Sequence, residues 1–350
     1  MNPLVVSAVT AATTALTITP IVRGAAIRGG YMDVPNERSS HVRPTPRTGG
    51  FAILVGLAAG TGAAGAWREG ATATTLLGTF GLALMALVDD WRPLSRLLRL
   101  VLQVALLAAV LTALASTGAI AWPASRVLTC IAWTVALVWL LGLVNTYNFM
   151  DGLNGIAGLS AAVTGATLAL LALRRGDLPS AVLATSVASA VLGFLPFNMI
   201  GGSIFMGDAG STVLGLVLGA LVLHAASLDH LPVAAALPLA PFVLDAGTTV
   251  IRRALRGERF FSTPHRSHYY QQLQQQGWSH AAVATLYACL TLACASVALA
   301  FDKLSLGQQV AALVGIVIGH AALFARIHAG WRRHIGGTSA GAATHGRASS

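Results

Sequence analysis

Four aspartates stand where long apolar stretches of the chain give way to polar segments: Asp89, Asp90, Asp151 and Asp208. They matter because the whole chain of 350 residues has only 12 acidic residues. A carboxylate close to the hydrocarbon of a membrane is costly, and it usually stays there because it binds something. Carboxylate oxygens ligate Mg²⁺ and, through it, phosphate groups. The first hypothesis is therefore phosphate chemistry at the ends of membrane-spanning helices.

Asp89 and Asp90 are adjacent in the sequence and follow an apolar stretch. One alternative is a capping role for a helix that begins near Leu94, helped by Pro93. A cap explains one aspartate and leaves the second without a role. The pair therefore favours binding of a metal or a phosphate over capping alone.

The segment NTYNFMDGLNG, residues 145–155, contains three asparagines, Asp151 and two glycines, with no Lys or Arg. Asparagine offers both donors and acceptors, and glycine lets the backbone approach a ligand closely. The string is typical of a site for a nucleobase, a sugar or hydrated Mg²⁺. An ordinary turn also favours these residues, but it needs fewer of them.

The segment FMGDAGST, residues 205–212, places Asp208 between glycines just before an apolar helix. A carboxylate there can ligate Mg²⁺, while free backbone N–H groups of the helix N-terminus face phosphate. The alternative is that Asp208 only caps the helix. Asn198 lies ten residues earlier, at the end of the preceding apolar stretch.

Two polar segments add positive charge. His265 and His268 are three residues apart with Arg266 between them, and on a helix they would share a face. Zinc is not supported, because no Cys or third His has ligand spacing, so phosphate contact fits better. The alternative is a basic segment lying on anionic lipid. Arg47 belongs to the Pro- and Arg-rich segment 33–50, which is either a linker or a loop that closes over the site.

The composition identifies the elements that must position these residues. Only 10% of the residues are charged, 55% are hydrophobic, and the mean hydropathy is +0.71. These values predict an all-α, polytopic membrane helix bundle with about eleven spans, ten being possible, since a span needs roughly 20 apolar residues. The expected spans are about 3–22, 49–66, 71–88, 98–118, 127–144, 155–173, 180–199, 210–227, 232–250, 281–301 and 307–326.

With eleven spans, alternate loops share one face, and that face carries 17 of the 22 Lys and Arg residues. The positive-inside rule makes this face cytoplasmic and puts the N-terminus outside. All the polar segments described above then lie in the cytoplasm. The formal net charge of +10 is explained by arginines near anionic lipid, so no nucleic-acid partner is expected.

The sequence predicts one membrane domain, residues 1–330, and a disordered cytoplasmic tail, 331–350, rich in Gly, Ala and Ser. Asp245 lies inside the ninth apolar stretch, where an acid is expected to make a hydrogen bond between helices or to support the site from outside.

Taken together, the segments resemble those of the polyprenyl-phosphate N-acetylhexosamine-1-phosphate transferases, a family of membrane enzymes. The resemblance covers about residues 30–285 in the expected order. Asp89-Asp90 matches the paired aspartates, residues 148–152 match N-x-x-D-G, residues 205–211 match F-M-G-D-x-G-S, and His265 and His268 fall in the His-rich motif.

The resemblance implies transfer of a sugar 1-phosphate from a UDP-sugar to undecaprenyl phosphate at the bacterial inner membrane, with release of UMP and a need for Mg²⁺ or Mn²⁺. It also suggests a homodimer. The residues implied as catalytic are Asp89, Asp90, Asp208, His265 and His268, with Asp208 and Asp89 at the metal. Those implied in substrate binding are Asn148, Asp151, Asn154, Asn198, Phe205, Arg266, Arg47 and Arg92. Because the acceptor phosphate is mostly ionised at neutral pH, Asp89 is expected to orient the metal or phosphate rather than to act as an essential base.

The chain departs from the peptidoglycan branch of this family, whose members carry a Lys after the aspartate pair and three consecutive histidines. Here Arg92 or Arg96 would supply that charge, and Asn154 stands where many members have Asp. These differences favour the branch that initiates O-antigen and related surface glycans. The phospho-N-acetylmuramoyl-pentapeptide transferases are the alternative within the family. A transporter is disfavoured, because transporters place their sites near the midplane of the membrane.

Overall fold

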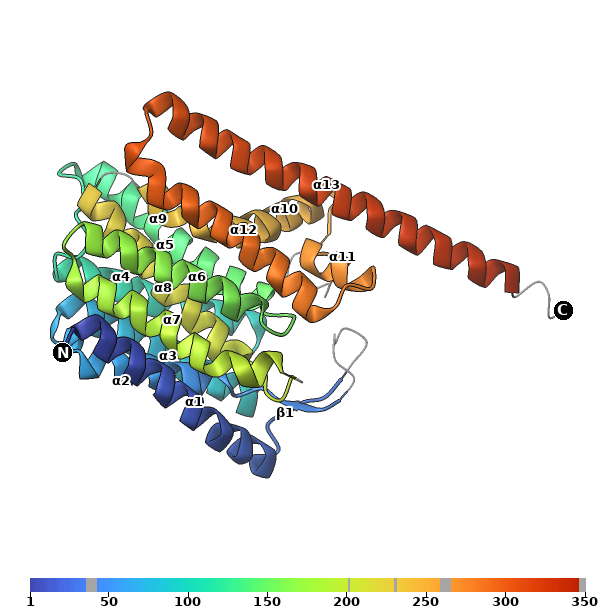
Figure 1. The fold of residues 1–350 in the computed structure, drawn as a ribbon, viewed down its shortest axis with the longest axis horizontal. Helices are drawn as coiled ribbons and strands as arrows, with labels where there is room; N and C mark the ends of the chain where they lie inside the picture. Colours follow the sequence, from blue (N-terminus) through green and yellow to red (C-terminus); the bar gives the residue numbers. More distant parts are fainter. Residues whose placement is uncertain (36–42, 201, 230–231, 259–265, 346–350) are drawn as a thin grey trace.

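The computed structural model describes residues 1–35, 43–200, 202–229, 232–258 and 266–345. The described chain is an antiparallel bundle of long helices with a small β-hairpin at one end (Figure 1). The elements are α1 Pro3–Gly29, β1 Met32–Asp33, β2 Thr45–Pro46, α2 Gly50–Ala63, η1 Ala66–Arg68, α3 Gly70–Trp91, α4 Arg96–Ser116, α5 Arg126–Met150, α6 Ile156–Arg174, α7 Leu178–Met199, α8 Gly207–Asp229, α9 Pro232–Ala236, η2 Leu237–Leu239, α10 Ala240–Leu255, α11 Tyr269–Gln275, α12 His280–Ala300, η3 Phe301–Lys303 and α13 Leu306–His345.

Within the described residues, ten helical segments are long and apolar enough to cross a membrane. One of them, Val233–Leu255, is assembled from α9, η2 and α10. The helix α2 has 14 residues, or roughly 21 Å at ~1.5 Å per residue, which is short for a ~30 Å hydrocarbon core. It nevertheless carries the chain from the end of α1 back to the start of α3. The predicted all-α polytopic bundle is confirmed, with ten candidate spans in the described residues and α2 as a shorter apolar helix beside them.

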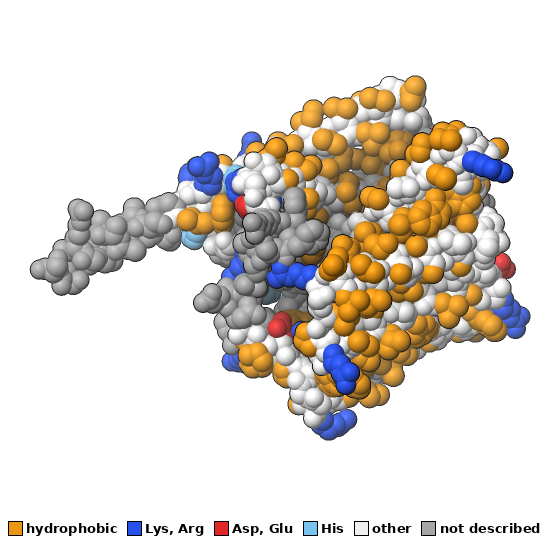
Figure 2. Space-filling model, turned by 180° about the vertical axis from the view of Figure 1, so that it is seen from behind, with side chains coloured by type: hydrophobic (Ala, Val, Ile, Leu, Met, Phe, Trp, Pro, Cys, Tyr) orange, Lys and Arg blue, Asp and Glu red, His pale blue; other side chains and the backbone are white. Residues whose placement is uncertain are grey.

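Hydrophobic side chains cover the sides of the bundle, and charged side chains gather at its two ends (Figure 2). This distribution is what a membrane imposes, since apolar side chains face lipid without cost while charged ones remain in water. The end where α3, α5 and α7 finish also carries the hairpin and α11, and it is called the site end below.

The predicted tail, residues 331–350, overlaps the end of α13, which continues to His345.

Two glycines let α2 and α8 approach each other closely at the site end. A methyl group on Gly50 would overlap the backbone of Gly210, and one on Gly210 would lie 2.7 Å from the Cα of Gly50. Small residues at such crossings let helix backbones pack directly. The contact holds the first turn of α8, which carries Asp208, against α2.

We expect Gly50→Ala to destabilise the protein by about 1–3 kcal/mol, because the added methyl group has no space and the backbone of α8 must move. The measurement is thermal unfolding in detergent. Gly62→Ala in the same helix is the matched control, since a methyl group there meets no atom within 4 Å. Melting of both variants at the wild-type temperature would show that the close contact at Gly50 does not contribute to stability.

Candidate active site

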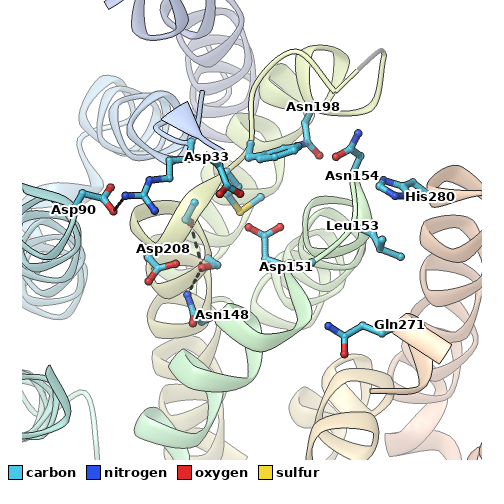
Figure 3. A pocket seen from close by; sticks show the side chains of 16 residues that line it. Asp33, Asp90, Asn148, Asp151, Leu153, Asn154, Asn198, Asp208, Gln271 and His280 are labelled. Carbon is cyan, nitrogen blue, oxygen red and sulfur yellow. Dashed lines mark hydrogen bonds and ion pairs between the residues drawn. The ribbon is translucent and has the colours of Figure 1, made fainter. Parts of the chain in front are cut away.

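A polar cavity of about 310 Å³ opens at the site end of the bundle. Its walls come from the hairpin region and from the ends of α3, α5, α7, α8, α11 and α12. The lining residues are Asp33, Arg47, Asp90, Asn148, Asp151, Gly152, Leu153, Asn154, Asn198, Phe205, Met206, Gly207, Asp208, Ser211, Gln271 and His280. Asp90 lies at one side of the cavity and His280 and Gln271 at the other, with Asp151 between them (Figure 3).

The segment 46–50 is bonded to the loop before α8 through the backbone. The N–H of Phe205 donates to Pro46 O at 2.7 Å, and the N–H groups of Gly49 and Gly50 donate to Phe205 O at 2.9 Å and to Met206 O at 2.8 Å. These bonds hold Arg47 at the cavity. The alternative that segment 33–50 is only a linker is therefore wrong for residues 46–50.

The side chain of Asn198 forms hydrogen bonds with the loop after α5 and with the loop after α7. Its Oδ1 accepts a hydrogen bond from Gly155 N at 2.7 Å, and its Nδ2 donates to Ile204 O at 3.1 Å. The side chain is 5% exposed. Both ends of the amide therefore bond to protein backbone, and Asn198 shapes the wall of the cavity by joining the loop after α5 to the loop after α7.

The charges lining the cavity are mostly negative. Four carboxylates, those of Asp33, Asp90, Asp151 and Asp208, face a single arginine, Arg47, among the described lining residues. Arg47 Nη2 lies 2.9 Å from Asp90 Oδ1. The Nε of the same guanidinium is buried and has no hydrogen-bond partner within the described part of the chain.

Arg99, which was not predicted as a site residue, forms ion pairs with two of the predicted site aspartates. Arg99 Nη1 lies 3.1 Å from Asp89 Oδ2 and 3.4 Å from Asp208 Oδ2. The other oxygen of Asp89 accepts the N–H of Leu94 at 2.8 Å. A cation in the first turn of a helix opposes the helix dipole. Arg99 at the start of α4 was therefore a usable signal of an acidic partner elsewhere.

Asp89 and Asp90 thus have different surroundings. Asp90 lines the cavity, whereas Asp89 is absent from its lining and is held by Leu94 and Arg99. The capping alternative is partly correct for Asp89, which bonds the loop before α4. The N-cap of α4 itself is Ser95, whose Oγ accepts from Leu98 N at 3.2 Å.

Asn148 and Ser211 join α5 to α8 at the floor of the cavity. Asn148 Nδ2 donates to Ser211 Oγ at 3.2 Å, and Ser211 Oγ in turn donates to Gly207 O at 3.2 Å. The side-chain oxygen of Asn148 makes no hydrogen bond among those that the structure describes. It lies in the same cavity as Asp151 and Asp208 (Figure 3).

Asp151 follows the last residue of α5, and burial raises the pKa of its carboxyl group well above the ordinary value of 3.8. The nearby carboxylate of Asp208 raises this pKa further. Burial disfavours the charged form, and a like charge adds to that effect. A site with this property attracts a cation, which would make both carboxylates stable in their ionised forms.

This shift predicts a pH-dependent stability in the absence of divalent cations. A carboxyl group whose pKa is raised on folding stabilises the fold at acid pH, and this contribution is lost as the pH rises through the raised pKa. Asp151→Asn is therefore expected to melt at a higher temperature than the wild type at neutral pH. The difference should shrink on acidification towards the ordinary carboxyl pKa. Thermal unfolding in EDTA across this range checks it, and a lower melting temperature for Asp151→Asn at neutral pH would contradict it.

The donor set fits a hard divalent cation. Asp151, Asp208 and Asn148 supply oxygen atoms in one cavity. In the described ranges, no three His, Cys, Asp or Glu residues form a complete protein ligand set. Mg²⁺ commonly binds through one or two carboxylates and completes its shell with water and substrate phosphates. The residues present therefore fit Mg²⁺ bound together with a phosphate-bearing substrate.

Several predicted site residues lie elsewhere. Arg92 is exposed at the end of α3 and Arg266 bonds Gln274 at 3.3 Å, and neither lines the cavity. His268 is 4% exposed, and its Nδ1 lies 3.1 Å from Asp245 Oδ1. His265 lies outside the described residues.

Other cavity residues were not predicted. Asp33, Ser211, Gln271 and His280 line the cavity without having been singled out. Ser211 lies inside the segment FMGDAGST, residues 205–212, so its place in the site could have been predicted from the sequence. Gln271 and His280 lie in polar sequence after the predicted His-rich motif, and the sequence has no feature that distinguishes them from neighbouring polar residues.

Comparison with known proteins identifies the family of the chain. A family model described as glycosyl transferase family 4 matches residues 72–226. The chain is 31% identical over 290 residues to the "Probable undecaprenyl-phosphate N-acetylglucosaminyl 1-phosphate transferase" of Bacillus subtilis, with 80% of each chain covered. It is 30% identical over 317 residues to the decaprenyl-phosphate N-acetylglucosaminephosphotransferase of Mycolicibacterium smegmatis, covering 80% of this chain and 77% of the relative.

A more limited likeness connects the chain to the phospho-N-acetylmuramoyl-pentapeptide-transferase of Clostridium perfringens, at 28% identity over 45% of this chain. The fold is that of a polytopic membrane protein with an acidic, amide-lined cavity at one end of its helix bundle. The chain belongs to glycosyl transferase family 4, the polyprenyl-phosphate N-acetylhexosamine-1-phosphate transferases. It is an enzyme that transfers a sugar phosphate to a polyprenyl phosphate in the membrane.

Proposed function

We propose that the protein transfers N-acetylhexosamine 1-phosphate from a UDP-sugar to undecaprenyl phosphate, releases UMP, and initiates a lipid-linked surface glycan of the O-antigen type. The site end would face the cytoplasm of a bacterium at its inner membrane, where UDP-sugars are present. The observation that carries the proposal is the cavity that brings Asp151, Asp208 and Arg47 together at a helix-bundle end. The acceptor phosphate can reach such a site while its prenyl chain stays in the lipid.

The reaction makes one P–O bond and breaks another. An oxygen of the acceptor phosphate attacks the β-phosphorus of the UDP-sugar, and the bond from that phosphorus to the bridging oxygen breaks. UMP leaves with the bridging oxygen. Because the acceptor phosphate has a second pKa near ~6, it is mostly ionised at neutral pH and needs no strong base. Catalysis then rests on positioning and on neutralising charge.

Mg²⁺, with Mn²⁺ as a substitute, would be held by Asp208 and Asp151 and would neutralise the phosphate charge that these carboxylates alone would repel. Arg47 is suited to a phosphate, since Asp90 leaves its buried Nε without a partner. Asp89 would act through Arg99, which it holds beside Asp208, rather than as a metal ligand. Phe205 and Asn154 would contact the nucleotide.

UDP-N-acetylglucosamine is the first candidate donor. Two relatives named for N-acetylglucosamine match about four fifths of the chain, whereas a pentapeptide transferase matches less than half. The cavity also carries uncharged hydrogen-bonding groups, those of Asn154 and Gln271, opposite Asp90, and such groups suit a neutral sugar or base.

The test is an assay of the purified protein in detergent with Mg²⁺, undecaprenyl phosphate and a panel of UDP-N-acetylhexosamines, scored for UMP. The panel includes UDP-N-acetylmuramoyl-pentapeptide, which represents the peptidoglycan alternative. The expected result is UMP release that depends on both the acceptor and UDP-N-acetylglucosamine. Turnover of the pentapeptide donor alone would favour the peptidoglycan reaction, and no UMP from any donor would refute the proposal.

A further inference from the structure

One further acidic residue, Asp245, lies outside the lining of the cavity and takes no direct part in the proposed chemistry. Asp245 on α10 is 0% exposed, inside an apolar helical segment. A carboxylate in such a place is tolerated only when its oxygens are fully hydrogen-bonded. The groups that face it are the side chains of Thr249, His268 and Tyr287 and the backbone N–H groups of Tyr269 and Tyr270.

The two oxygens of Asp245 divide these partners. Oδ1 accepts from the N–H of Tyr269 at 3.1 Å and lies 3.1 Å from His268 Nδ1. Oδ2 accepts from the N–H of Tyr270 at 3.2 Å and from the hydroxyl of Tyr287 on α12. The first two backbone N–H groups of α11 therefore both end on this carboxylate. Asp245 fixes the start of α11 against α10 and α12.

The helix α11 in turn contacts the end of α5. The hydroxyl of Tyr270 donates to Phe149 O at 2.8 Å, two residues before Asp151. Tyr270 also packs against Gly152, where a methyl group would overlap its hydroxyl. The next residue of α11, Gln271, lines the cavity. One short helix thus joins the buried carboxylate to both sides of Asp151.

We propose that Asp245 is a positioning residue for the transfer reaction: by fixing α11, it makes Tyr270 hold the loop of Asp151 in place. The inference rests on the proposed function, because it assigns Asp245 and Tyr270 an effect on donor binding at that site. The phenol of Tyr270 carries the effect, and Tyr287 serves only to complete the hydrogen bonds of the carboxylate. A purely structural cluster would instead alter stability and leave the kinetic constants of the folded enzyme unchanged.

Two tyrosines allow a matched experiment. Tyr270→Phe and Tyr287→Phe each remove one phenol hydroxyl from a fully buried ring, but only that of Tyr270 contacts the end of α5. Tyr270→Phe is expected to raise the KM for UDP-N-acetylglucosamine about five- to tenfold, the loss of roughly one hydrogen bond. Tyr287→Phe is expected to change this KM less than about twofold, although it too should lower the melting temperature.

Asp245→Asn is the third variant to be measured in this experiment. The amide keeps one acceptor oxygen but presents an NH₂ group to α11, so the KM is expected to rise more than in Tyr270→Phe. All constants are measured well below each melting temperature, so that unfolded protein does not contribute. If the wild type is active and Tyr270→Phe has the same KM, the inference is wrong while the proposed function is unaffected. Absence of UMP release by the wild type would overturn the proposed function, and this inference with it.

Discussion

Asp208→Asn is expected to lower the rate of UMP release by about a thousandfold, the largest effect of any single substitution in the cavity. Its carboxylate is 48% exposed, lies in the first turn of α8 and faces the same cavity as Asp151. An amide of the same size keeps the shape and loses the charge that a divalent cation needs. The measurement is kcat with saturating substrates at a series of Mg²⁺ concentrations.

The control for Asp208→Asn is Asp302→Asn, an exposed aspartate in η3 far along the chain from the cavity. That variant is expected to show wild-type kinetics. A cation role also predicts that raising the Mg²⁺ concentration partly restores Asp208→Asn. If Asp208→Asn retained more than about a tenth of the activity, the metal role of Asp208 would be untenable.

Arg99→Ala is expected to have the second largest effect, a loss of about a hundredfold in kcat/KM for the acceptor. Arg99 Nη1 lies between Asp89 and Asp208, so its removal leaves two carboxylates without their shared cation. It also removes the positive charge that lies 3.4 Å from the carboxylate of Asp208. Arg99→Lys is expected to recover part of the activity, because lysine keeps the charge but not the planar, forked geometry.

Arg96→Ala is the matched control for Arg99, since Arg96 lies one turn earlier in α4 and is exposed. Its activity is expected to remain within about twofold of wild type, as is usual for exposed surface positions. Asp89→Asn is expected to resemble a mild form of Arg99→Ala, because Arg99 would lose one of its two partners. Equal activity of Arg99→Ala and Arg96→Ala would exclude a role for this arginine.

The fold was predictable because membrane insertion imposes a simple rule on sequence. Long apolar stretches must become helices whose backbone groups bond internally, so composition alone indicates the bundle and its crossings. The length of α2 was the exception. Gly50 lets this helix begin against α8, and the resulting 14-residue helix is shorter than the apolar stretch 49–66 that suggested it.

The site was predictable where its residues share a short motif. Asn148 and Asp151 lie on one turn at the end of α5, and Asp208 lies at the start of α8, so local sequence was enough to single them out. Arg99 and Gln271 were not accessible in this way. The position of Arg99 predicts an acidic partner but does not say that Asp208, far away in the sequence, is one of them. Gln271 lines the cavity because α11 packs against the end of α5, and nothing in one sequence states which helices become neighbours.

The hydrogen bonds of Asp245 show the same limit of prediction from a single sequence. Its buried position within an apolar stretch predicted a hydrogen bond between helices, and the structure confirms this with Tyr287. The partners on α11, by contrast, depend on how the loop after α10 folds back. His268 therefore appeared to be a group for phosphate contact, whereas its Nδ1 faces Asp245.

The most direct test of the central claim follows the β-phosphorus of the donor. UDP-N-acetylglucosamine labelled at that atom is incubated with the enzyme, Mg²⁺ and undecaprenyl phosphate, and the lipid and nucleotide fractions are separated. Transfer of a sugar 1-phosphate predicts that the label enters the lipid and that the released nucleotide is unlabelled UMP. Label recovered in free UDP, with unlabelled sugar on the lipid, would show transfer of the sugar alone and would contradict the account.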